Sequence, residues 1–111
     1  MKIIPYSRQY IDKKDKFEVQ RVLSSNLITS GPKVELFEKI VRKYCNTKFS
    51  IGVSSGTDAL LLALMALGIQ PGDEVITTPI TFCATANSIL YEGAKLKLVD
   101  IDKDTLNIDH K

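Results

Sequence analysis

The sequence contains no tryptophan, two cysteines, two methionines, a single histidine and no long apolar run. Its longest apolar stretch covers residues 59–67, much shorter than the roughly 20 residues of a membrane span. The thiols have no C-x-x-C spacing, so neither a zinc site nor a disulfide is indicated. The first residues also lack a signal-peptide core. We therefore expect a cytoplasmic protein without membrane contact, with Cys45 and Cys83 reduced and buried.

Charge is distributed unevenly but forms no block of one sign. Residues 1–48 hold 11 Lys and Arg against 5 Asp and Glu, and residues 49–111 hold 4 against 8, so +6 and −4 give the net +2. The basic half would suit an anionic ligand. No aromatic residues alternate with its basic ones, so nucleic acid is not an expected partner. Solvated helix faces account for most of the excess.

The size and composition are those of one ordinary globular domain. The chain has 111 residues, of which 44% are hydrophobic and 25% charged. Its first part predicts an extended arm over residues 1–11, a helix over 13–24 capped by Asp12, a polar loop, and an amphipathic helix over 33–45.

The second part alternates strands with helices. The expected elements are a strand at 49–53, a helix at 59–67, a strand at 74–78, a helix at 81–92 and a strand at 95–100. Short connections between them predict parallel β-α-β units, hence an α/β fold. The helix at 59–67 is apolar all round, so we expect it to be buried and to end at Gly68. Because three strands form only a small open sheet, we expect the chain to be a segment of a larger protein.

Residues 54–58 join the first predicted strand to the buried helix. One interpretation is a simple helix cap, because Ser55 and Asp58 have capping-box spacing. The other is a phosphate site, in which the first N–H groups of the helix face the anion, Gly56 allows close approach, and Ser55 and Thr57 add hydroxyls. The segment matches neither dinucleotide nor triphosphate fingerprints. The residue types alone leave the two interpretations open.

Residues 77–87 also lie where a strand gives way to a helix, the edge at which ligands collect in open α/β sheets. Phe82, in this segment, could lie against a planar ring, although an isolated Phe is more often a core residue. A third segment, with Asp100, Asp102 and Asp104, resembles the start of a calcium loop. Thr105 stands at its glycine position and Lys111 at its final glutamate, so an acidic turn is the better interpretation.

Five motifs in order resemble the DegT/DnrJ/EryC1/StrS family of sugar aminotransferases, which use pyridoxal phosphate. They are Ile28-Thr29-Ser30-Gly31-Pro32, Ser55-Gly56-Thr57-Asp58-Ala59-Leu60, Pro71-Gly72-Asp73-Glu74-Val75-Ile76, Thr81-Phe82-x-Ala84-Thr85-Ala86-Asn87 and Val99-Asp100-Ile101-Asp102. Pro5-Tyr6-Ser7 and the run at 77–82 are most similar to the branch that makes 4-amino sugars for pseudaminic acid. The resemblance covers nearly the whole chain.

The resemblance implies a fold and a set of roles. The fold would be the N-terminal part of a fold-type I large domain, a three-layer α/β/α structure with a mostly parallel sheet. Residues 1–32 would be an arm, a helix and a substrate loop, and residues 33–111 the first part of the cofactor-binding domain. The implied cofactor residues are Ser55, Gly56, Thr57 and Phe82. The implied nucleotide-sugar residues are Tyr6, Asn26, Leu27, Ile28 and Thr29.

The implied reaction moves an amino group, with glutamate as the expected donor, to C4 of a nucleotide-linked 4-keto-6-deoxy sugar such as a UDP-linked N-acetylhexosamine. The full protein would be a homodimer. In this family the lysine that holds the cofactor lies beyond residue 111, so no catalytic residue is assigned here and the chain alone should be inactive. Two alternatives stay open: a non-catalytic phosphate- or nucleotide-binding α/β module, and an interaction module in which both helix starts are plain caps.

Overall fold

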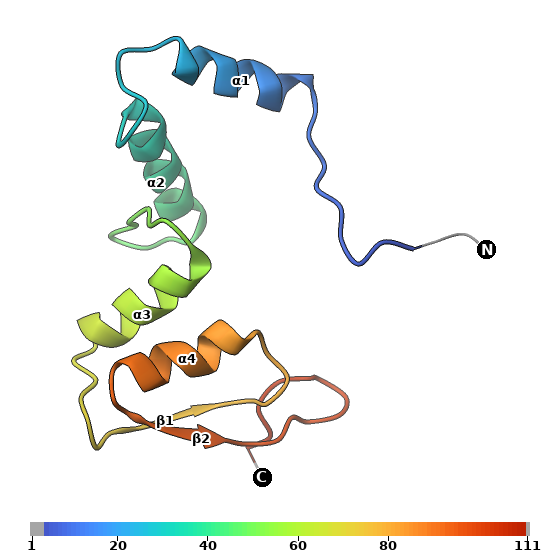
Figure 1. The fold of residues 1–111 in the computed structure, drawn as a ribbon, viewed down its shortest axis with the longest axis vertical. Coiled ribbons are helices and arrows are strands. Elements are labelled where there is room, and N and C mark those ends of the chain that lie inside the picture. Colours follow the sequence, from blue (N-terminus) through green and yellow to red (C-terminus); the bar gives the residue numbers. More distant parts are fainter. Residues whose placement is uncertain (1–3, 111) are drawn as a thin grey trace. The chain divides into compact units, whose positions relative to one another are not determined.

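The computed structural model describes residues 4–110. They form the helices α1 (Lys13–Leu23), α2 (Pro32–Tyr44), α3 (Gly56–Ala66) and α4 (Cys83–Tyr91), and the strands β1 (Glu74–Thr77) and β2 (Lys95–Leu98) (Figure 1). Contacts divide the chain into two compact units, Met1–Gly52 and Val53–Lys111. The boundary predicted at residue 32 stays a prediction. No helix within 4–110 is long and apolar enough to cross a membrane.

The first unit contains the two predicted N-terminal helices, and both are confirmed to within one residue at each end. Asp12 and Asp15 form a reciprocal capping box at the start of α1, each carboxylate accepting the other's backbone N–H at 2.9 Å. Gly31 is the N-cap of α2, and Pro32 occupies its first turn. Proline suits that position because its missing N–H has no partner inside the helix.

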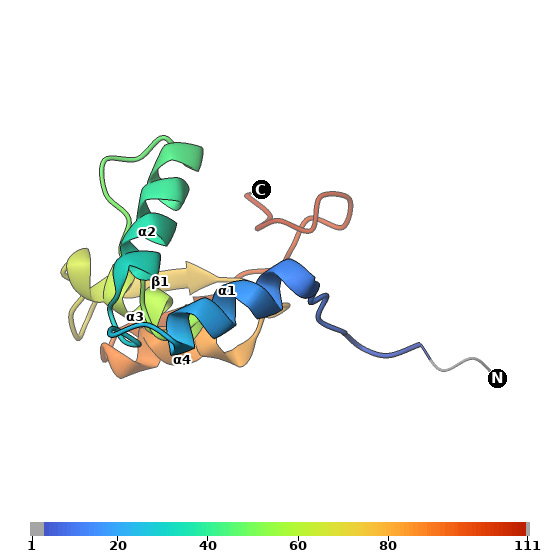
Figure 2. The same ribbon diagram turned by 90° about the horizontal axis from the view of Figure 1, so that it is seen from above.

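The second unit is built on a parallel β-α-β motif, as the alternation of elements predicted. β1 pairs with β2 in the register Glu74 to Lys95 through Thr77 to Leu98. The connecting helix α4 packs on both strands, and α3 packs on α4, so sheet, α4 and α3 follow one another in layers (Figure 1, Figure 2). Gly68 has φ 75°, the left-handed conformation expected after α3.

The strand predicted at 49–53 is wrong for this chain, whose sheet has two strands within the described residues. A strand exists only where a neighbouring backbone completes its ladder. Here the segment is irregular, and Gly52 N–H donates instead to the Glu38 side chain, Oε1, at 2.7 Å. The alternation of apolar residues therefore identifies a segment that could join a sheet, but it does not identify the strand with which that segment would pair.

The buried status predicted for α3 is also wrong. None of its residues is buried, and Leu60, Leu62 and Met65 are all exposed. Only α4 packs extensively against α3 within the described part of the chain, and one neighbour covers one side of a helix. The core is correspondingly small: its buried apolar residues are Ala84, Ile89 and Ala94, with Ser88 beside them.

The apolar side chains of α4 and β2 are covered only in part. Ile89 is buried, whereas Phe82 and Leu90 are exposed, and so is Leu98 on β2. Cys45 and Cys83 are free and exposed, which corrects their predicted burial. Cys45 follows the end of α2 and Cys83 is the first residue of α4, so both lie at helix ends.

Candidate functional site

The starts of α3 and α4 lie at the same end of the second unit. Both helices begin on the side where β1 ends and run from there toward the side where β1 starts (Figure 1, Figure 2). This is the carboxyl edge of the parallel strands, where α/β proteins bind their ligands. The two motifs that the sequence singled out, residues 54–58 and 77–87, therefore lie at the same edge.

Ser55 caps α3. Its backbone is extended, and its hydroxyl accepts the N–H of Asp58 at 3.1 Å. The cap interpretation of this segment is thus confirmed. It does not exclude a phosphate, because none of the described residues accepts a hydrogen bond from the N–H groups of Gly56 and Thr57. These two donors are free for an anion.

Asp58 modifies the electrostatics of this helix start. Its carboxylate accepts hydrogen bonds from the hydroxyls of Ser54 and Ser55, the latter at 2.8 Å. The Ser54 hydroxyl, followed by that of Ser55, lowers the pKa of Asp58 below its ordinary value. Both hydroxyls are therefore oriented toward a carboxylate that is ionised at neutral pH, and the backbone N–H groups remain the main donors available to a ligand.

Gly56 leaves the approach to those donors open. A Cβ built on this glycine would have nothing within 4 Å. No atom of this segment therefore blocks access to the two N–H groups at this position. The free N–H groups, the open space and the positive end of the α3 dipole together fit the phosphate of a cofactor.

Phe82 is the N-cap residue of α4 and its side chain is 75% exposed. Phe82 is therefore not a core residue within this chain. An exposed aromatic ring at the ligand edge could stack on a planar cofactor ring. Thr81 and Thr85, one turn apart at the same helix start, have their hydroxyls 3.0 Å from each other.

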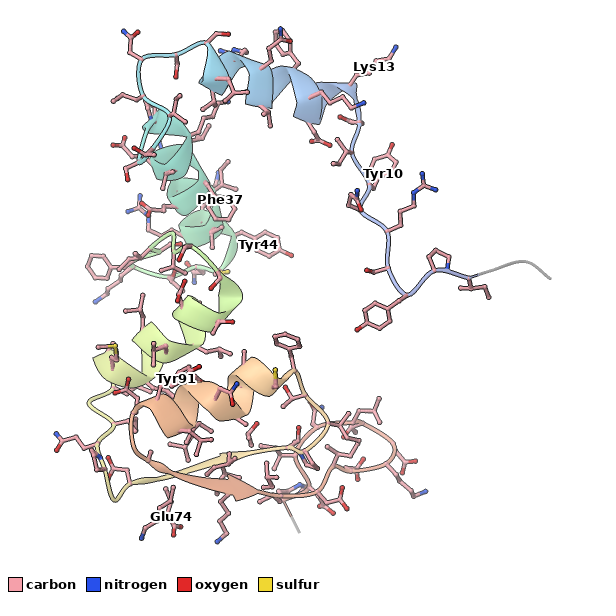
Figure 3. The ribbon with its side chains drawn as sticks, viewed as in Figure 1. Tyr10, Lys13, Phe37, Tyr44, Glu74 and Tyr91 are labelled. Atoms are coloured by element: carbon pink, nitrogen blue, oxygen red, sulfur yellow. The ribbon has the colours of Figure 1, made fainter. Side chains whose placement is uncertain are left out.

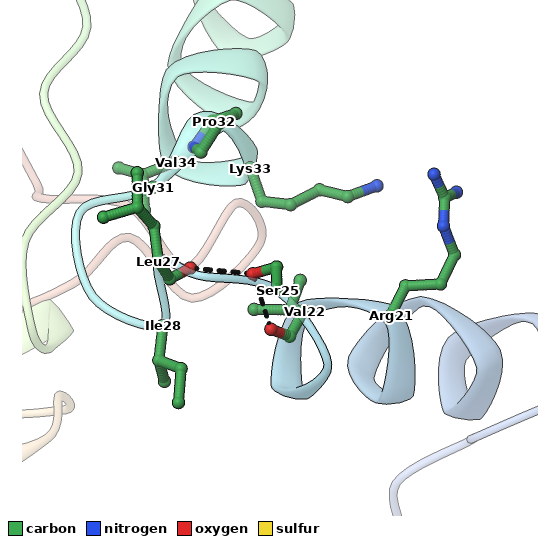
Figure 4. A pocket seen from close by; sticks show the side chains of 9 residues that line it. All are labelled: Arg21, Val22, Ser25, Leu27, Ile28, Gly31, Pro32, Lys33 and Val34. Carbon is green, nitrogen blue, oxygen red and sulfur yellow. Dashed lines mark hydrogen bonds between the residues drawn. The ribbon is translucent and has the colours of Figure 1, made fainter.

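The residues expected to meet the nucleotide sugar belong to the first unit. Leu27 and Ile28 line a pocket of about 200 Å³ at the turn between α1 and α2 (Figure 4). Asn26 and Thr29 belong to the same loop but do not line that pocket. Tyr6 lies in the extended arm before α1 and is fully exposed. Tyr10, further along the arm, is 89% exposed (Figure 3).

Sequence reasoning missed two cations at this pocket, Arg21 and Lys33. Arg21 lies in the last turn of α1 and Lys33 in the first turn of α2. In the sequence they are two of the 11 Lys and Arg of residues 1–48, and nothing there sets them apart. The sequence gives little indication that these two residues share a site, because only the fold of the loop brings residues 12 positions apart to one pocket.

The acidic segment forms a turn, as expected. One carboxylate oxygen of Asp102 accepts the N–H groups of Asp104 and Thr105 and the Thr105 hydroxyl, at 2.8–3.1 Å. These bonds, the Thr105 N–H first, lower the pKa of Asp102. Ile101 and Ile108 close the loop with an antiparallel bridge. No group of side chains suited to a metal ion occurs among the described residues.

The fold and the edge site define an α/β protein with two helix starts at one ligand edge. Comparison with known proteins makes the assignment more specific. The family model of the DegT/DnrJ/EryC1/StrS aminotransferase family matches residues 9–111. The chain belongs to this family, as its five motifs suggested.

Individual relatives align along almost the whole chain. The spore coat polysaccharide biosynthesis protein SpsC of Bacillus subtilis (strain 168) is 49% identical over 106 residues, 96% of this chain and 27% of SpsC. The UDP-4-amino-4,6-dideoxy-N-acetyl-beta-L-altrosamine transaminase of Campylobacter jejuni (serotype O:23/36, strain 81-176) is 43% identical over 109 residues, 98% of this chain and 28% of that protein.

A solved structure shows the same fold. The putative sugar aminotransferase Spr1654 from Streptococcus pneumoniae, in its PLP form, superposes with a TM-score of 0.88 at 38% identity, over 96% of this chain and 27% of that one. The chain is thus an α/β segment with parallel strands that spans about a quarter of the length of the relatives it matches.

Proposed function

We propose that this chain is the N-terminal segment of a pyridoxal-phosphate enzyme that transfers an amino group, from glutamate, to C4 of a nucleotide-linked 4-keto-6-deoxy sugar. The single observation that carries the proposal is the composition of the ligand edge of the second unit. This edge combines free N–H groups at the start of α3 with the exposed ring of Phe82 at the start of α4, in a chain that belongs to an aminotransferase family. The edge would belong to a fold-type I large domain.

Each part of the edge has a role in holding the cofactor. Gly56 and Thr57 would bind the phosphate through their backbone N–H groups, Ser55 would hold the helix start in place, and Phe82 would lie against the pyridine ring. Pyridoxal phosphate, when bound, supplies the electron sink that amino-group exchange requires. The protein's own contribution here is to bind and orient, and this chain assigns no residue to proton transfer.

The proposed substrate class rests on the first unit and on the relatives. The transaminase of Campylobacter jejuni acts, by its name, on a UDP-linked amino sugar, which supports a UDP-4-keto-6-deoxy-N-acetylhexosamine as the acceptor. Leu27 and Ile28 would provide apolar surface at this substrate, with Tyr6, Asn26 and Thr29 nearby in the arm and loop. The complete enzyme would be a cytoplasmic homodimer, and the 111-residue chain alone would be inactive.

The direct test is a chimera in which this chain replaces the aligned segment of the Campylobacter jejuni transaminase, 43% identical to it. We expect the chimera to bind pyridoxal phosphate, seen by its absorbance after dialysis, and to aminate the UDP-linked 4-keto sugar with glutamate, seen by mass spectrometry. A folded chimera that retains the cofactor but transfers nothing would refute the substrate assignment. A folded chimera without cofactor would favour the non-catalytic binding module.

Two substitutions of Gly56 test whether the cofactor phosphate binds at the start of α3. Gly56→Ala fits this segment because its Cβ meets nothing within 4 Å, so in a chimera that folds normally we expect a loss of cofactor through crowding of the phosphate. Gly56→Asp adds a negative charge beside the phosphate, and we expect it to abolish cofactor retention. Unchanged absorbance of the dialysed Gly56→Asp chimera would contradict the site.

A further inference from the structure

An ion pair links α1 to α2 across the loop between them. The Glu18 carboxylate accepts a hydrogen bond from the Arg21 guanidinium at 3.0 Å and, through its other oxygen, one from the Lys33 ammonium. Arg21 is one turn further along the same helix, whereas Lys33 belongs to the first turn of α2. Among the ion pairs of residues 4–110, the Glu18–Lys33 pair alone connects these two helices.

The loop itself has restraints at its ends and none at its tip. The Ser25 hydroxyl is 2.7 Å from the carbonyl oxygen of Val22 and 3.1 Å from that of Leu27. At the other end Gly31 is buried, and a Cβ on it would come within 3.0 Å of the Leu27 carbonyl oxygen. No described residue forms a hydrogen bond with residues 28–30. The shape of the tip therefore depends on where α1 ends and α2 begins.

The pocket at this loop depends on the same two helix ends. Arg21 comes from α1, Lys33 from α2, and Leu27 and Ile28 from the loop between them (Figure 4). Because Glu18 pairs with both cations, it restrains their side chains at the pocket and offsets part of their charge. A change in the separation of the helices would move Leu27 and Ile28 with them.

We propose that Glu18 is a positioning residue: through Lys33 it sets the placement of α2 against α1, and thereby the shape of the loop that meets the substrate. The inference rests on the proposed function for the contact between this loop and the substrate and for the identity of that substrate. Glu18 itself lines no part of the pocket with Leu27 and Ile28. Its side chain is 43% exposed, so the pair is partly screened and its effect is graded rather than all-or-none.

A double-mutant cycle on the full-length enzyme, or on the active chimera, tests this role. Glu18→Gln and Lys33→Met each remove the pair and keep most of the side-chain volume. We expect each to raise KM for the UDP-linked sugar about twofold to fivefold, the range that an exposed ion pair allows, with kcat unchanged. The double variant should be no worse than either single one, because the second change removes nothing more.

Hydrogen exchange of the backbone amides at residues 26–31 gives a readout that needs no activity. We expect faster exchange in both single variants and in the double variant. Glu35→Gln is the matched control: it makes the same chemical change on an exposed carboxylate in the first turn of α2, for which no ion pair is described within residues 4–110. This control should leave KM and loop exchange unchanged.

Other outcomes would overturn the proposal. If Lys33 bound the substrate's phosphates directly, Lys33→Met would raise KM more than Glu18→Gln, and Glu18→Gln would lower KM by releasing the cation. Additive effects in the double variant, or unchanged loop exchange in Glu18→Gln, would also overturn it. Absence of amino transfer by the unsubstituted protein would instead refute the proposed function, and the exchange measurements would still test the positioning role.

Discussion

At the scale of the residue, a substitution of Phe82 distinguishes a role in cofactor binding from a role in the core of the protein. Its side chain is 75% exposed, so truncation removes little buried surface from this segment. Phe82→Ala in the full-length protein should therefore lower affinity for pyridoxal phosphate several-fold, because a stacked ring contributes roughly 0.5–1.5 kcal/mol beyond its burial. The melting temperature of the cofactor-free protein should change little.

Melting curves of the cofactor-free wild type and variant, beside a cofactor titration of each, measure both quantities. Truncation of a buried phenylalanine destabilises a protein by about 3–5 kcal/mol. A large drop in melting temperature with normal cofactor affinity would thus show that the rest of the protein buries Phe82 in a core, and would end the stacking assignment.

Asp58 gives a prediction about pH. Hydrogen bonds from Ser54 and then Ser55 lower its pKa, so the folded state favours the ionised carboxylate. Its contribution to stability is present above the pKa of the unfolded carboxyl and is lost as pH falls through the lowered folded value. Ser54→Ala should raise the pKa of Asp58 toward its ordinary value, measured by NMR titration of that carboxyl. An unmoved titration would show that the Ser54 contact is absent in solution.

At the scale of the element, the caps of α1 and α3 form a matched pair. Asp12 and Ser55 both accept an N–H at the third position of their helix, but only Ser55 lies at the proposed cofactor edge. Asp12→Ala and Ser55→Ala should each destabilise the full-length protein by about 1 kcal/mol, measured by urea unfolding. Only Ser55→Ala should also weaken cofactor binding. Equal cofactor affinity in the two variants would leave Ser55 with a purely structural role.

The helices and strands also show which structural features a local sequence pattern can predict. Caps, prolines and helical periodicity act within a few residues, and they placed α1 and α2 to within one residue at each end. Residues 49–53 have an equally clear alternation but no ladder in this chain, because a strand depends on a distant backbone. Likewise, the all-apolar sequence of α3 predicts a buried helix, and burial requires neighbours that residues 4–110 do not supply.

At the scale of the whole molecule, this segment leaves much apolar surface uncovered. Leu60, Leu62, Met65 and Ile76 are among its exposed large side chains, and the core holds only a few small residues and Ile89. Parallel sheets are stable when both faces are covered, and here α4 covers one. We expect the 111-residue chain expressed alone to show no cooperative thermal transition and to associate through its exposed faces. A soluble monomer with a sharp calorimetric transition would contradict this.

The sequence by itself determined the family, the order of helices and strands after residue 55, the caps, and the two motifs at the ligand edge, because each depends on residues close together in the chain. Only the tertiary structure decided that Phe82 is exposed, that both cysteines are accessible, that the sheet of this segment has two strands, and that Glu18 and Lys33 pair across a loop. These properties depend on which distant segments meet. Burial, strand pairing and ion pairing are set by neighbours in space, and periodicity along the chain does not identify them.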